Sequence, residues 1–501
     1  MRDLTEMPKL LTVSLLLCSA SSAWCMNVVQ AQAAPPEPDA EVTAEPAPVP
    51  PPPPAAEAAA TEPPQEAFPP LSSSVKSQVA ALDPVQEDDP RLGMLARSGY
   101  PLTPSVTAAN YSDQFVVSGY VQAQFESHQD SEDGQFQGGA LQNQDRFSIR
   151  RGRVRVARDW EWGQVFVEAD ANTNRGPALR LQKAEVSLLY GRNRDVDIPP
   201  LVQLTLGQFD TPFGFEVPYT SRVRFFTERS AGSRAIFPSE PDVGVRLSGG
   251  WSFLRYSLAL TNGEPLEEPS GFGLRDPNRN KDITGRLGAE VKPTKRIAIA
   301  GGVSFNRGRG FHAATSDTKD SLTWRDGNDN ASVDTGAGEV MGQPGMQGTP
   351  ARNFARWAIG ADLEFLARTK AGWSMLQVEA FAASNLDRAL YIADPIVSGA
   401  DLREYGYLVS WTQEISPYAA LGFRYDYYNP NSDFLDSRAG RQIPVSQRVQ
   451  SFTMLAALVF PHRARLVFEY VVSNDYLARD KRGVPSDLPN NHWTLRLQGT
   501  L

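Results

Sequence analysis

Apolar and polar residues alternate at every second position through most of the chain from residue 114 onward. Between residues 114 and 126, Val121 and Phe125 lie on one face of this pattern, and Gln122 and Gln124 lie on the other. A period of two residues is typical of a β-strand, whereas an α-helix would repeat its apolar positions every three to four residues. The pattern therefore predicts strands that have one apolar face and one polar face.

Sixteen segments carry this alternation. They span residues 114–126, 145–157, 163–172, 178–190, 201–209, 241–249, 251–262, 282–292, 296–306, 353–366, 373–383, 402–412, 416–427, 447–460, 463–474 and 491–501. The segments between them are mostly long after odd-numbered strands and mostly short after even-numbered ones. Transmembrane β-barrels have this layout, with short periplasmic turns and longer extracellular loops, and closure removes the unpaired strand edges that lipid cannot satisfy. We therefore predict an all-β fold, a 16-stranded antiparallel transmembrane β-barrel that occupies residues 111–501 and lies in the outer membrane.

The chain before the barrel has a different composition. Basic residues precede an apolar stretch at residues 10–17, and small residues lead to the sequence Ala-Gln-Ala at 31–33. This layout predicts a secretory signal peptide over residues 1–33. Residues 34–70 contain 14 prolines, with Ala and Glu making up most of the remainder, and such a segment has little apolar surface to bury. We predict that residues 34–110 form a disordered, acidic, Pro-rich periplasmic linker.

Charge and cysteine content narrow the possible functions. The net charge of the chain, −9 at pH 7, comes from residues 34–90 of the predicted linker, where acidic residues far outnumber the single base, Lys76. The barrel is close to neutral, so the acidity of the chain does not argue against an anion channel. Both cysteines, Cys18 and Cys25, lie in the predicted signal peptide, which excludes thiol catalysis, cysteine metal sites and disulfides from the folded part. No apolar run reaches 18 residues, which excludes a helical membrane protein.

A row of arginines is predicted on the inner face of the second strand. A barrel of this size has a water-filled interior, so the polar faces of the strands set its selectivity. Arg151, Arg153 and Arg155 follow one another at a spacing of two residues, which places them about 7 Å apart along the strand. Guanidinium groups in a row can replace part of the hydration shell of a passing phosphate or carboxylate. The alternative is that these arginines pair with acidic residues of adjacent strands and stiffen the wall, and the sequence leaves both interpretations open.

A second group of arginines lies in the long segment from Asp210 to Glu240, after the fifth strand. This segment contains Arg222, Arg224 and Arg229. If the segment folds into the barrel, it narrows the channel and places these charges at the constriction. If it lies outside, the same arginines only form a solvated surface. We expect the first arrangement.

Several short blocks resemble a known family. The run at 207–216, Gly-Gln-Phe-Asp-Thr-Pro-Phe-Gly-Phe-Glu, resembles the G-x-F-x-x-P-F-x-x-E signature of the phosphate-selective porin O and P family. Residues 147–154, 226–230, 242–249 and 256–263 resemble further blocks of that family and occur in the same order and spacing. The expected number of strands extends the resemblance to the carboxyl end.

The resemblance implies an outer-membrane porin, usually trimeric, whose third outer loop folds into the lumen and whose arginines line an anion path. On this sequence it implies six residues of the anion path: Arg151, Arg153, Arg155, Arg222, Arg224 and Arg229. Two features depart from the pattern of strict phosphate selectivity. Glu240-Pro241 stands where an arginine often precedes the next block, and the first strand offers Gln122 and Gln124 inward where a basic residue would help an anion.

The function expected from these observations is passive diffusion of small hydrophilic solutes through an outer-membrane porin, with a preference for anions such as phosphate or polyphosphate. The expected partners are outer-membrane lipid, small anionic solutes and further copies of the chain in a homotrimer. One alternative is a non-selective general porin. Another is a structural outer-membrane anchor that is tethered through the Pro-rich leader.

Enzymatic function is not expected. The four histidines, His128, His312, His462 and His492, fall in predicted loops, turns or strand ends, and no serine motif accompanies them. The Asp-rich stretch 326–330 offers calcium-type ligands, but it lacks the glutamate of a helix-loop-helix motif and is typical of an outer loop. No basic patch with interleaved aromatic residues supports nucleic-acid binding. We expect no catalytic residue, metal or cofactor.

Overall fold

The structure is a computed structural model. It describes residues 115–129, 145–174, 176–191, 199–238, 241–263, 278–294, 296–333, 338–436, 443–444, 446–460, 464–477 and 490–500. The predicted signal peptide, residues 1–33, and the predicted linker, residues 34–110, lie outside the described residues and stay predictions.

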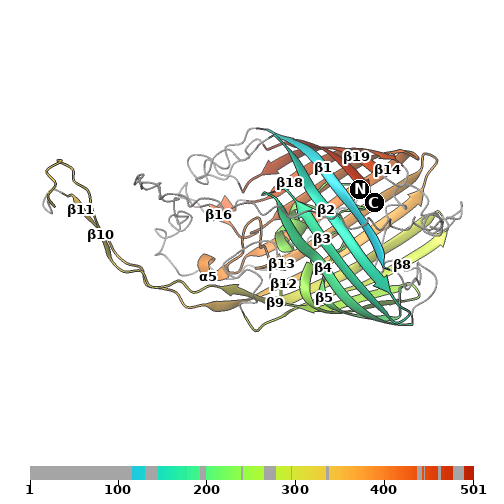
Figure 1. The fold of residues 1–501 in the computed structure, drawn as a ribbon, viewed down its shortest axis with the longest axis horizontal. Coiled ribbons are helices and arrows are strands. Elements are labelled where there is room, and N and C mark those ends of the chain that lie inside the picture. The colour runs from blue at the N-terminus through green and yellow to red at the C-terminus, as the bar shows by residue number, and fades with distance from the viewer. Residues whose placement is uncertain are drawn as a thin grey trace, which may run out of the picture. The chain divides into compact units, whose positions relative to one another are not determined.

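Sixteen strands form one closed antiparallel barrel (Figure 1). They are β1 (Val116–His128), β2 (Arg146–Asp159), β3 (Gly163–Asn172), β4 (Ala178–Tyr190), β5 (Val202–Asp210), β6 (Pro241–Trp251), β7 (Leu254–Thr261), β8 (Asp282–Thr294), β9 (Ile297–His312), β12 (Arg352–Arg368), β13 (Trp373–Ser384), β14 (Arg403–Ser416), β15 (Ala419–Asn429), β18 (Val449–Phe460), β19 (Ala464–Asp475) and β20 (His492–Thr500). The first strand pairs with the last, from Tyr120 opposite Thr500 to His128 opposite His492, and this pairing closes the barrel. The structure thus confirms the 16 predicted strands and their closure.

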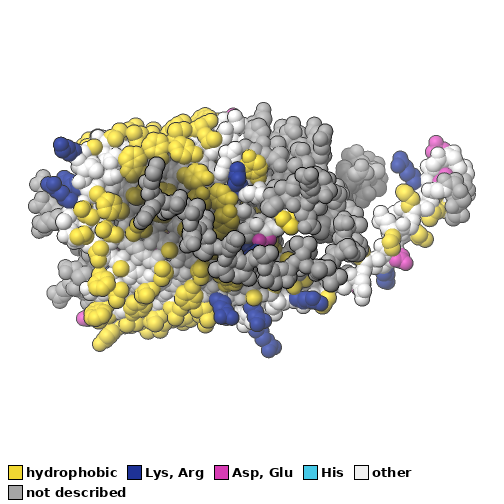
Figure 2. All heavy atoms as spheres, turned by 180° about the vertical axis from the view of Figure 1, so that it is seen from behind, with side chains coloured by type: hydrophobic (Ala, Val, Ile, Leu, Met, Phe, Trp, Pro, Cys, Tyr) yellow, Lys and Arg dark blue, Asp and Glu magenta, His cyan; other side chains and the backbone are white. Residues whose placement is uncertain are grey.

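The two faces of the strands differ in the way a membrane requires. On β1, the side chains of Gln122 and Gln124 face the interior and are buried, whereas Val121 is 46% exposed. On β2, Arg153 is buried and Phe147 is 85% exposed. Apolar side chains cover much of the outer wall (Figure 2). A closed antiparallel barrel that is polar inside and apolar outside has the solvation of an outer-membrane protein, since lipid contacts the outer face and water the inner one. The protein is therefore a transmembrane barrel of the outer membrane.

The connections between strands alternate in length around the barrel. Only residues 252–253 join β6 to β7, and only 417–418 join β14 to β15, whereas residues 211–240 follow β5 and residues 385–402 follow β13. The long connections share one end of the barrel because consecutive strands run in opposite directions. In outer-membrane barrels the end with the long loops is the extracellular one.

One long connection contains strands that the alternation did not predict. Strand β9 continues to His312, beyond the predicted end at residue 306, and remains paired with β12 up to Arg352. Beyond this ladder, β10 (Ser321–Trp324) pairs with β11 (Val340–Gln343). We term residues 313–351 the arm, and Figure 1 shows its hairpin projecting away from the barrel. The alternation of apolar and polar residues ends before the pairing of β9 with β12 does, because the part of a strand that extends beyond the lipid needs no apolar outer face.

Short elements complete the described fold. They are the helices α4 (Ala231–Ile236) and α5 (Pro395–Ser398) and the short strands β16 (Leu435–Asp436) and β17 (Ile443–Pro444). The hydroxyl of Ser230 accepts a hydrogen bond from the backbone N–H of Ser233 and so caps the amino end of α4. Among the described residues, no helix combines the length and the apolar character needed to cross a bilayer.

Candidate functional site in the barrel lumen

The segment that follows β5 folds into the barrel. We term residues 211–240 the lumen loop, of which the structure describes 211–238. The N–H of Gly214 donates to the hydroxyl of Ser304 on β9 at 3.0 Å, and the N–H groups of Phe215 and Glu216 donate to the Glu379 carboxylate on β13 at 2.9 and 3.1 Å. These bonds tie the first part of the loop to the inner wall. Gly214 has a φ of +60°, and a Cβ at this position would lie 2.3 Å from a Glu379 oxygen, so the contact requires glycine.

Other parts of the wall hold the second half of the loop. Thr227 donates from its backbone N–H and its hydroxyl to Glu469 on β19, at 2.8 and 2.6 Å. The N–H of Ala231 donates to Asp426 on β15 at 3.1 Å. Arg496 on β20 donates to the carbonyl of Thr227 at 2.7 Å. Since strands from β9 round to β20 hold its backbone, the lumen loop crosses the interior of the barrel.

Apolar side chains of the loop pack against inward-facing aromatic residues. Phe213 and Phe237 are buried, lie 5.2 Å apart between ring centroids, and belong to a cluster with Phe381 of the wall. A second cluster joins Phe226 to Trp373 on β13. Burying several large side chains contributes roughly 1.5 to 3 kcal/mol for each one, which adds an apolar anchor to the hydrogen bonds.

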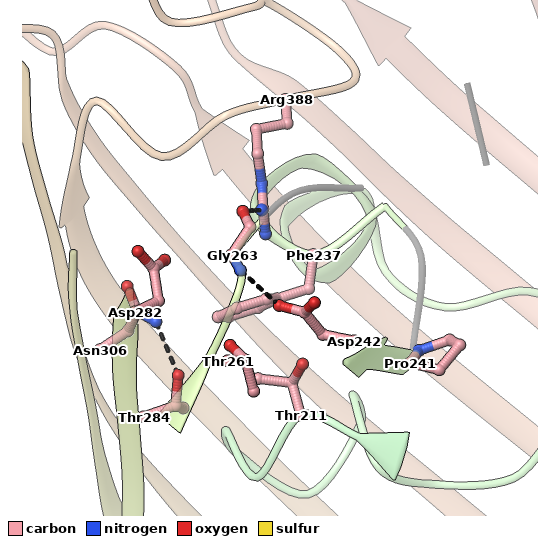
Figure 3. Close-up of a pocket in the computed structure, with 10 residues that line it drawn as sticks. All are labelled: Thr211, Phe237, Pro241, Asp242, Thr261, Gly263, Asp282, Thr284, Asn306 and Arg388. Carbon is pink, nitrogen blue, oxygen red and sulfur yellow. Dashed lines mark hydrogen bonds between the residues drawn. The ribbon is translucent and has the colours of Figure 1, made fainter. Parts of the chain in front are cut away.

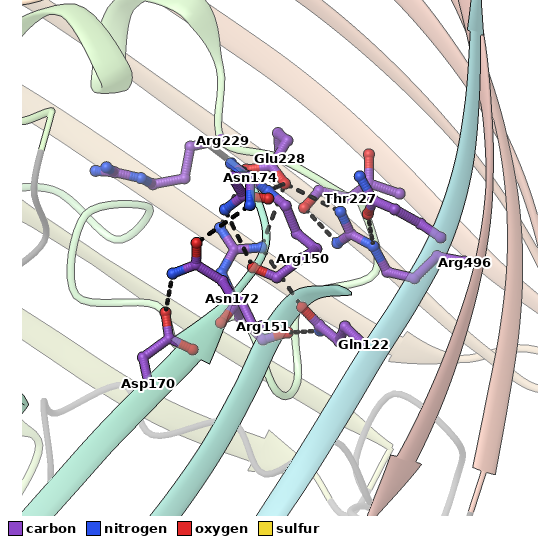
Figure 4. A network of polar contacts seen from close by, with 12 residues as sticks. Gln122, Arg150, Arg151, Asp170, Asn172, Asn174, Thr227, Glu228, Arg229 and Arg496 are labelled. Atoms are coloured by element: carbon purple, nitrogen blue, oxygen red, sulfur yellow. Dashed lines mark hydrogen bonds and ion pairs between the residues drawn. The ribbon is translucent and has the colours of Figure 1, made fainter. Parts of the chain in front are cut away.

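The charged centre of the site is Glu228 (Figure 4). Its carboxylate accepts hydrogen bonds from Arg150 at 2.8 and 3.1 Å, from Arg151 at 3.2 and 3.1 Å, and from Arg496 at 3.0 Å. Arg150 and Arg151 belong to β2 and Arg496 belongs to β20, whereas Glu228 comes from the lumen loop. We term these four residues the arginine cluster. Three positive charges share one negative charge, so the cluster carries an excess of positive charge.

The carboxyl group of Glu228 is held in its ionised form. Burial alone would raise its pKa, but the charges of Arg150 and Arg151 and a hydrogen bond from Arg150 outweigh burial and hold the pKa of Glu228 well below its usual value. Arg424 on β15 donates to the backbone carbonyl of Glu228 at 2.7 Å and adds another positive group beside the cluster. The lumen loop is therefore anchored to β2 and β20 by a permanent charge interaction.

A β-bulge explains how two consecutive arginines reach the same carboxylate. Gln122 of β1 lies opposite Arg151 of β2, and the next residue, Ala123, lies opposite Ile149. Arg150 is therefore an extra residue on β2, and such a bulge re-aims a side chain. Strict alternation along β2 assigns Arg150 to the lipid face, which is why sequence reasoning did not include it in the site.

The other two arginines of the predicted row pair with acidic residues of the wall. Arg153 lies 3.3 Å from Glu168 and 3.7 Å from Asp170, and Arg155 lies 3.5 Å from Glu168. Both acids belong to the adjacent strand, β3. For Arg153 and Arg155, the geometry agrees with the interpretation in which arginines stiffen the wall. Arg151 differs from them because its partner lies on the lumen loop.

The three predicted arginines of the loop occupy different environments. Burial and the positive charge of Arg155 lower the pKa of Arg222. Arg224 is buried and lines a pocket that also includes Glu216. Arg229 donates to the carbonyl of Phe237 at 2.9 Å and thereby supports the turn after α4. The six predicted residues therefore do not form one cluster, and Arg151 is the predicted member that joins Arg150, Arg496 and Glu228.

A second long loop also reaches into the barrel, which the sequence did not predict. In residues 385–402, the backbone N–H of Arg388 donates to the carbonyl of Ala235 at 2.9 Å, and its guanidinium donates to the carbonyls of Ile236, at 2.9 Å, and Gly263. Ala235 and Ile236 belong to α4. The loop therefore braces the lumen loop from the extracellular end.

A pocket lies beside this contact (Figure 3). Its polar lining includes Asp242 of β6, Asp282 of β8 and Arg388. Asp242 accepts a hydrogen bond from the N–H of Gly263 at 2.8 Å, and Asp282 pairs with Arg356 at 3.1 Å. Acidic and basic groups are thus equal in number in this part of the wall, whereas the arginine cluster on β2, β20 and the lumen loop has three arginines for one carboxylate.

Comparisons with known proteins add a likeness in fold. No family model matches the chain, and no curated protein matches it. Among solved structures it is similar to the outer membrane channel DcaP of Acinetobacter baumannii, at 11% identity over 78% of this chain and 99% of that one, with a TM-score of 0.49. It is similar to an anion-selective porin from Comamonas acidovorans, at 8% identity over 77% and 99% of the two chains, with a TM-score of 0.44. It is also similar to the trimer form of the outer membrane protein OmpT of Vibrio cholerae, at 10% identity over 77% and 99%, with a TM-score of 0.45.

These similarities carry no argument about solute or mechanism, because the identities and scores are low. The strand pairing shows the closed barrel, and the burial of the side chains shows its apolar outer surface. The resemblance to the phosphate-selective porin O and P family rests on the sequence blocks and stays a prediction.

Proposed function

We propose that the protein is an outer-membrane porin through which small hydrophilic solutes diffuse passively, with a preference for small anions such as phosphate or polyphosphate. The observation that carries this proposal is the lumen loop, which crosses the barrel and brings Glu228 against three arginines of the wall. A loop in this position narrows the path, so a solute passes close to its charges. The excess of positive charge in the cluster favours anions at that point.

The arginine cluster is suited to weak, reversible binding of an anion, as a channel requires, and less to tight binding. Arg150 and Arg151 present planar donors that can replace water around a phosphate oxygen. A conducting site must bind a solute strongly enough to admit it and weakly enough to release it. Glu228 meets the second requirement, because it is a fixed counter-ion that partly neutralises the guanidinium groups. A passing anion therefore competes with a carboxylate that is already bound to the wall.

The proposal includes a homotrimer as the working unit. The sequence resemblance implies this state, and one of the similar solved structures is described as a trimer. Chemical crosslinking of the purified protein in mild detergent tests it. A ladder that ends at three chains supports a trimer, and a single band at one chain at every crosslinker concentration argues against it.

A general, non-selective porin is the second candidate. The pairing of Arg153 with Glu168 and Asp170 favours it, because paired charges contribute little net field to the lumen. The carboxylates of Asp242 and Asp282 on another part of the wall also favour the general porin, because their negative charges offset the positive charge of the arginine cluster. Under this alternative the arginine cluster holds the loop in place and does not select solutes.

Reconstitution in a planar lipid bilayer decides between these candidates. Under a KCl gradient, a reversal potential displaced toward the chloride equilibrium potential supports the anion channel. A reversal potential near zero supports the general porin, and one displaced toward potassium rejects the anion preference. Absence of conductance from correctly folded protein rejects the channel itself and favours the structural anchor.

A further inference from the structure

Two arginines project outward from the barrel where its apolar surface ends. On β9, Val303 and Phe305 are 59% and 44% exposed and belong to the lipid-facing surface. Asn306 is buried and faces the lumen. Arg307 and Arg309 continue the outward row of Val303 and Phe305, and both are exposed. Their side chains therefore leave the wall on its lipid side.

The neighbouring strands show the depth of these arginines in the membrane. Arg307 lies opposite Ile283 of β8 and opposite Trp357 of β12. Ile283 and Trp357 are 45% and 42% exposed and belong to the apolar surface. A tilted strand crosses the hydrocarbon core in about 9 to 11 residues, which the stretch from Ile297 to Phe305 supplies. Arg307 thus lies at the level of the lipid headgroups, on the extracellular side where the long loops emerge.

The positive charges at this edge are concentrated in one sector. Arg307 and Arg309 are two residues apart on one strand, which separates them by about 7 Å. Lys281, which lies one residue before the start of β8 and two residues before Ile283, is also exposed. Two positive charges at this distance repel each other, and an anion bound between them offsets this repulsion. Figure 2 shows Lys and Arg side chains at the edge of the apolar surface next to the arm.

An arginine at the same end of another strand provides a contrast. Arg403, at the start of β14, is paired through two hydrogen bonds with Asp433. In the part of the chain that the structure describes, Arg307 and Arg309 form no ion pair with an acidic residue. No acidic residue in the described part of the chain therefore serves as their counter-ion, and both guanidinium groups can bind an external anion.

We propose that Arg307 and Arg309 bind the phosphate groups of a phosphorylated lipid in the outer leaflet. The alkyl stems of the two arginines can lie along the apolar surface while the guanidinium groups reach the headgroups. The forked donors of arginine match phosphate oxygens. The acyl chains of the same lipid pack against Phe305 and Trp357. The site lies outside the lumen, so it does not depend on the proposed anion selectivity.

Native mass spectrometry of the full-length protein in mild detergent tests this proposal. The probes are lipid A, a glycolipid that carries two phosphate groups, and the same lipid after enzymatic removal of the phosphates. We expect the wild-type protein to bind the phosphorylated lipid about tenfold more tightly than the dephosphorylated one. The double variant R307Q/R309Q should lose this difference, and R307K/R309K should keep part of it. The matched control R403Q, at the same end of the barrel, should behave like the wild type.

Three outcomes would overturn the proposal. One is equal binding of the phosphorylated lipid by the wild type and by R307Q/R309Q, with circular dichroism confirming that both are folded. Another is equal binding of the two lipids by the wild type, which would assign the binding to the acyl chains alone. The third is binding of inorganic phosphate by the wild type as tightly as the phosphorylated lipid, with the same loss in R307Q/R309Q, which would identify free phosphate as the ligand.

Discussion

The substitution Glu228→Gln separates a selecting role of the arginine cluster from an anchoring role. The carboxylate of Glu228 accepts hydrogen bonds from Arg150, Arg151 and Arg496. Glutamine keeps the size of the side chain and one acceptor oxygen but removes the negative charge. The wall bonds of Thr227 to Glu469 remain, so the lumen loop should stay in place. The variant therefore changes the charge of the constriction with little change in its shape.

The expected effect follows from the Coulomb energy of one unit charge. An anion about 6 Å from residue 228 is repelled by the carboxylate by about 0.7 kcal/mol at the dielectric constant of water and by about 3 kcal/mol at an effective value of 20. Screening is modest at this distance, because the Debye length is about 10 Å in 0.1 M salt. The lower energy corresponds to roughly a threefold change in occupancy, since about 1.4 kcal/mol is a factor of ten. We therefore expect Glu228→Gln to raise the anion-to-cation permeability ratio about threefold or more.

The assay is the reversal potential of single channels in a planar bilayer under a KCl gradient. The matched control is Glu161→Gln, which removes the same charge from an exposed residue in the turn after β2. We expect the control to leave the reversal potential unchanged. An equal shift in both variants would attribute the effect to overall charge, and a shift of Glu228→Gln toward cations would refute the selecting role. A larger conductance with unchanged selectivity would show that the cluster only holds the loop.

Three further predictions concern the lumen loop. Arg151→Gln should lower the anion-to-cation permeability ratio about threefold, because it removes one positive charge that attracts the anion with a Coulomb energy of similar size. The reversal potential measures this change. Gly214→Ala should lower the thermal unfolding temperature more than the control Gly399→Ala. Both glycines have a positive φ, but only at Gly214 would an added Cβ meet a Glu379 oxygen, at 2.3 Å. Equal decreases in the unfolding temperature, measured by circular dichroism, would contradict the packing argument. The depressed pKa of Glu228 contributes stability that is present above its ordinary value of 4.5 and is lost as pH falls through the folded value. The difference in reversal potential between the wild type and Glu228→Gln should therefore stay constant from neutral pH down to 4.5, and a change in this difference within that range would contradict the reasoning.

The barrel could be predicted from the sequence because lipid imposes a rule on every residue of a spanning strand. Val121 must face lipid and Gln122 must face water, and the same requirement repeats along each strand. This rule has no force beyond the membrane. The continuation of β9 to His312 and the hairpin of the arm were therefore missed, although their backbone pairing is regular.

The site could be predicted only in part, because it depends on contacts between distant segments. Alternation correctly placed Arg151 on the inner face, but the bulge that brings Arg150 to the same carboxylate leaves no sign in the pattern. The partner of both, Glu228, is 77 residues from Arg151 along the chain. The inward fold of residues 385–402 depends on Arg388 reaching backbone carbonyls of α4, and backbone acceptors are present in every sequence.

The arrangement of charges explains why a preference for anions need not mean tight binding. The arginine cluster lies on β2, β20 and the lumen loop, whereas Asp242 and Asp282 lie on β6 and β8. Under the proposed function, anions would be drawn toward the arginine cluster and cations toward the carboxylates, and the two groups differ in how far their charges are neutralised. Asp282 is matched by Arg356 one to one, but Glu228 is matched by three arginines. The difference in matching, more than the number of arginines in the barrel, is what would give the channel its preference.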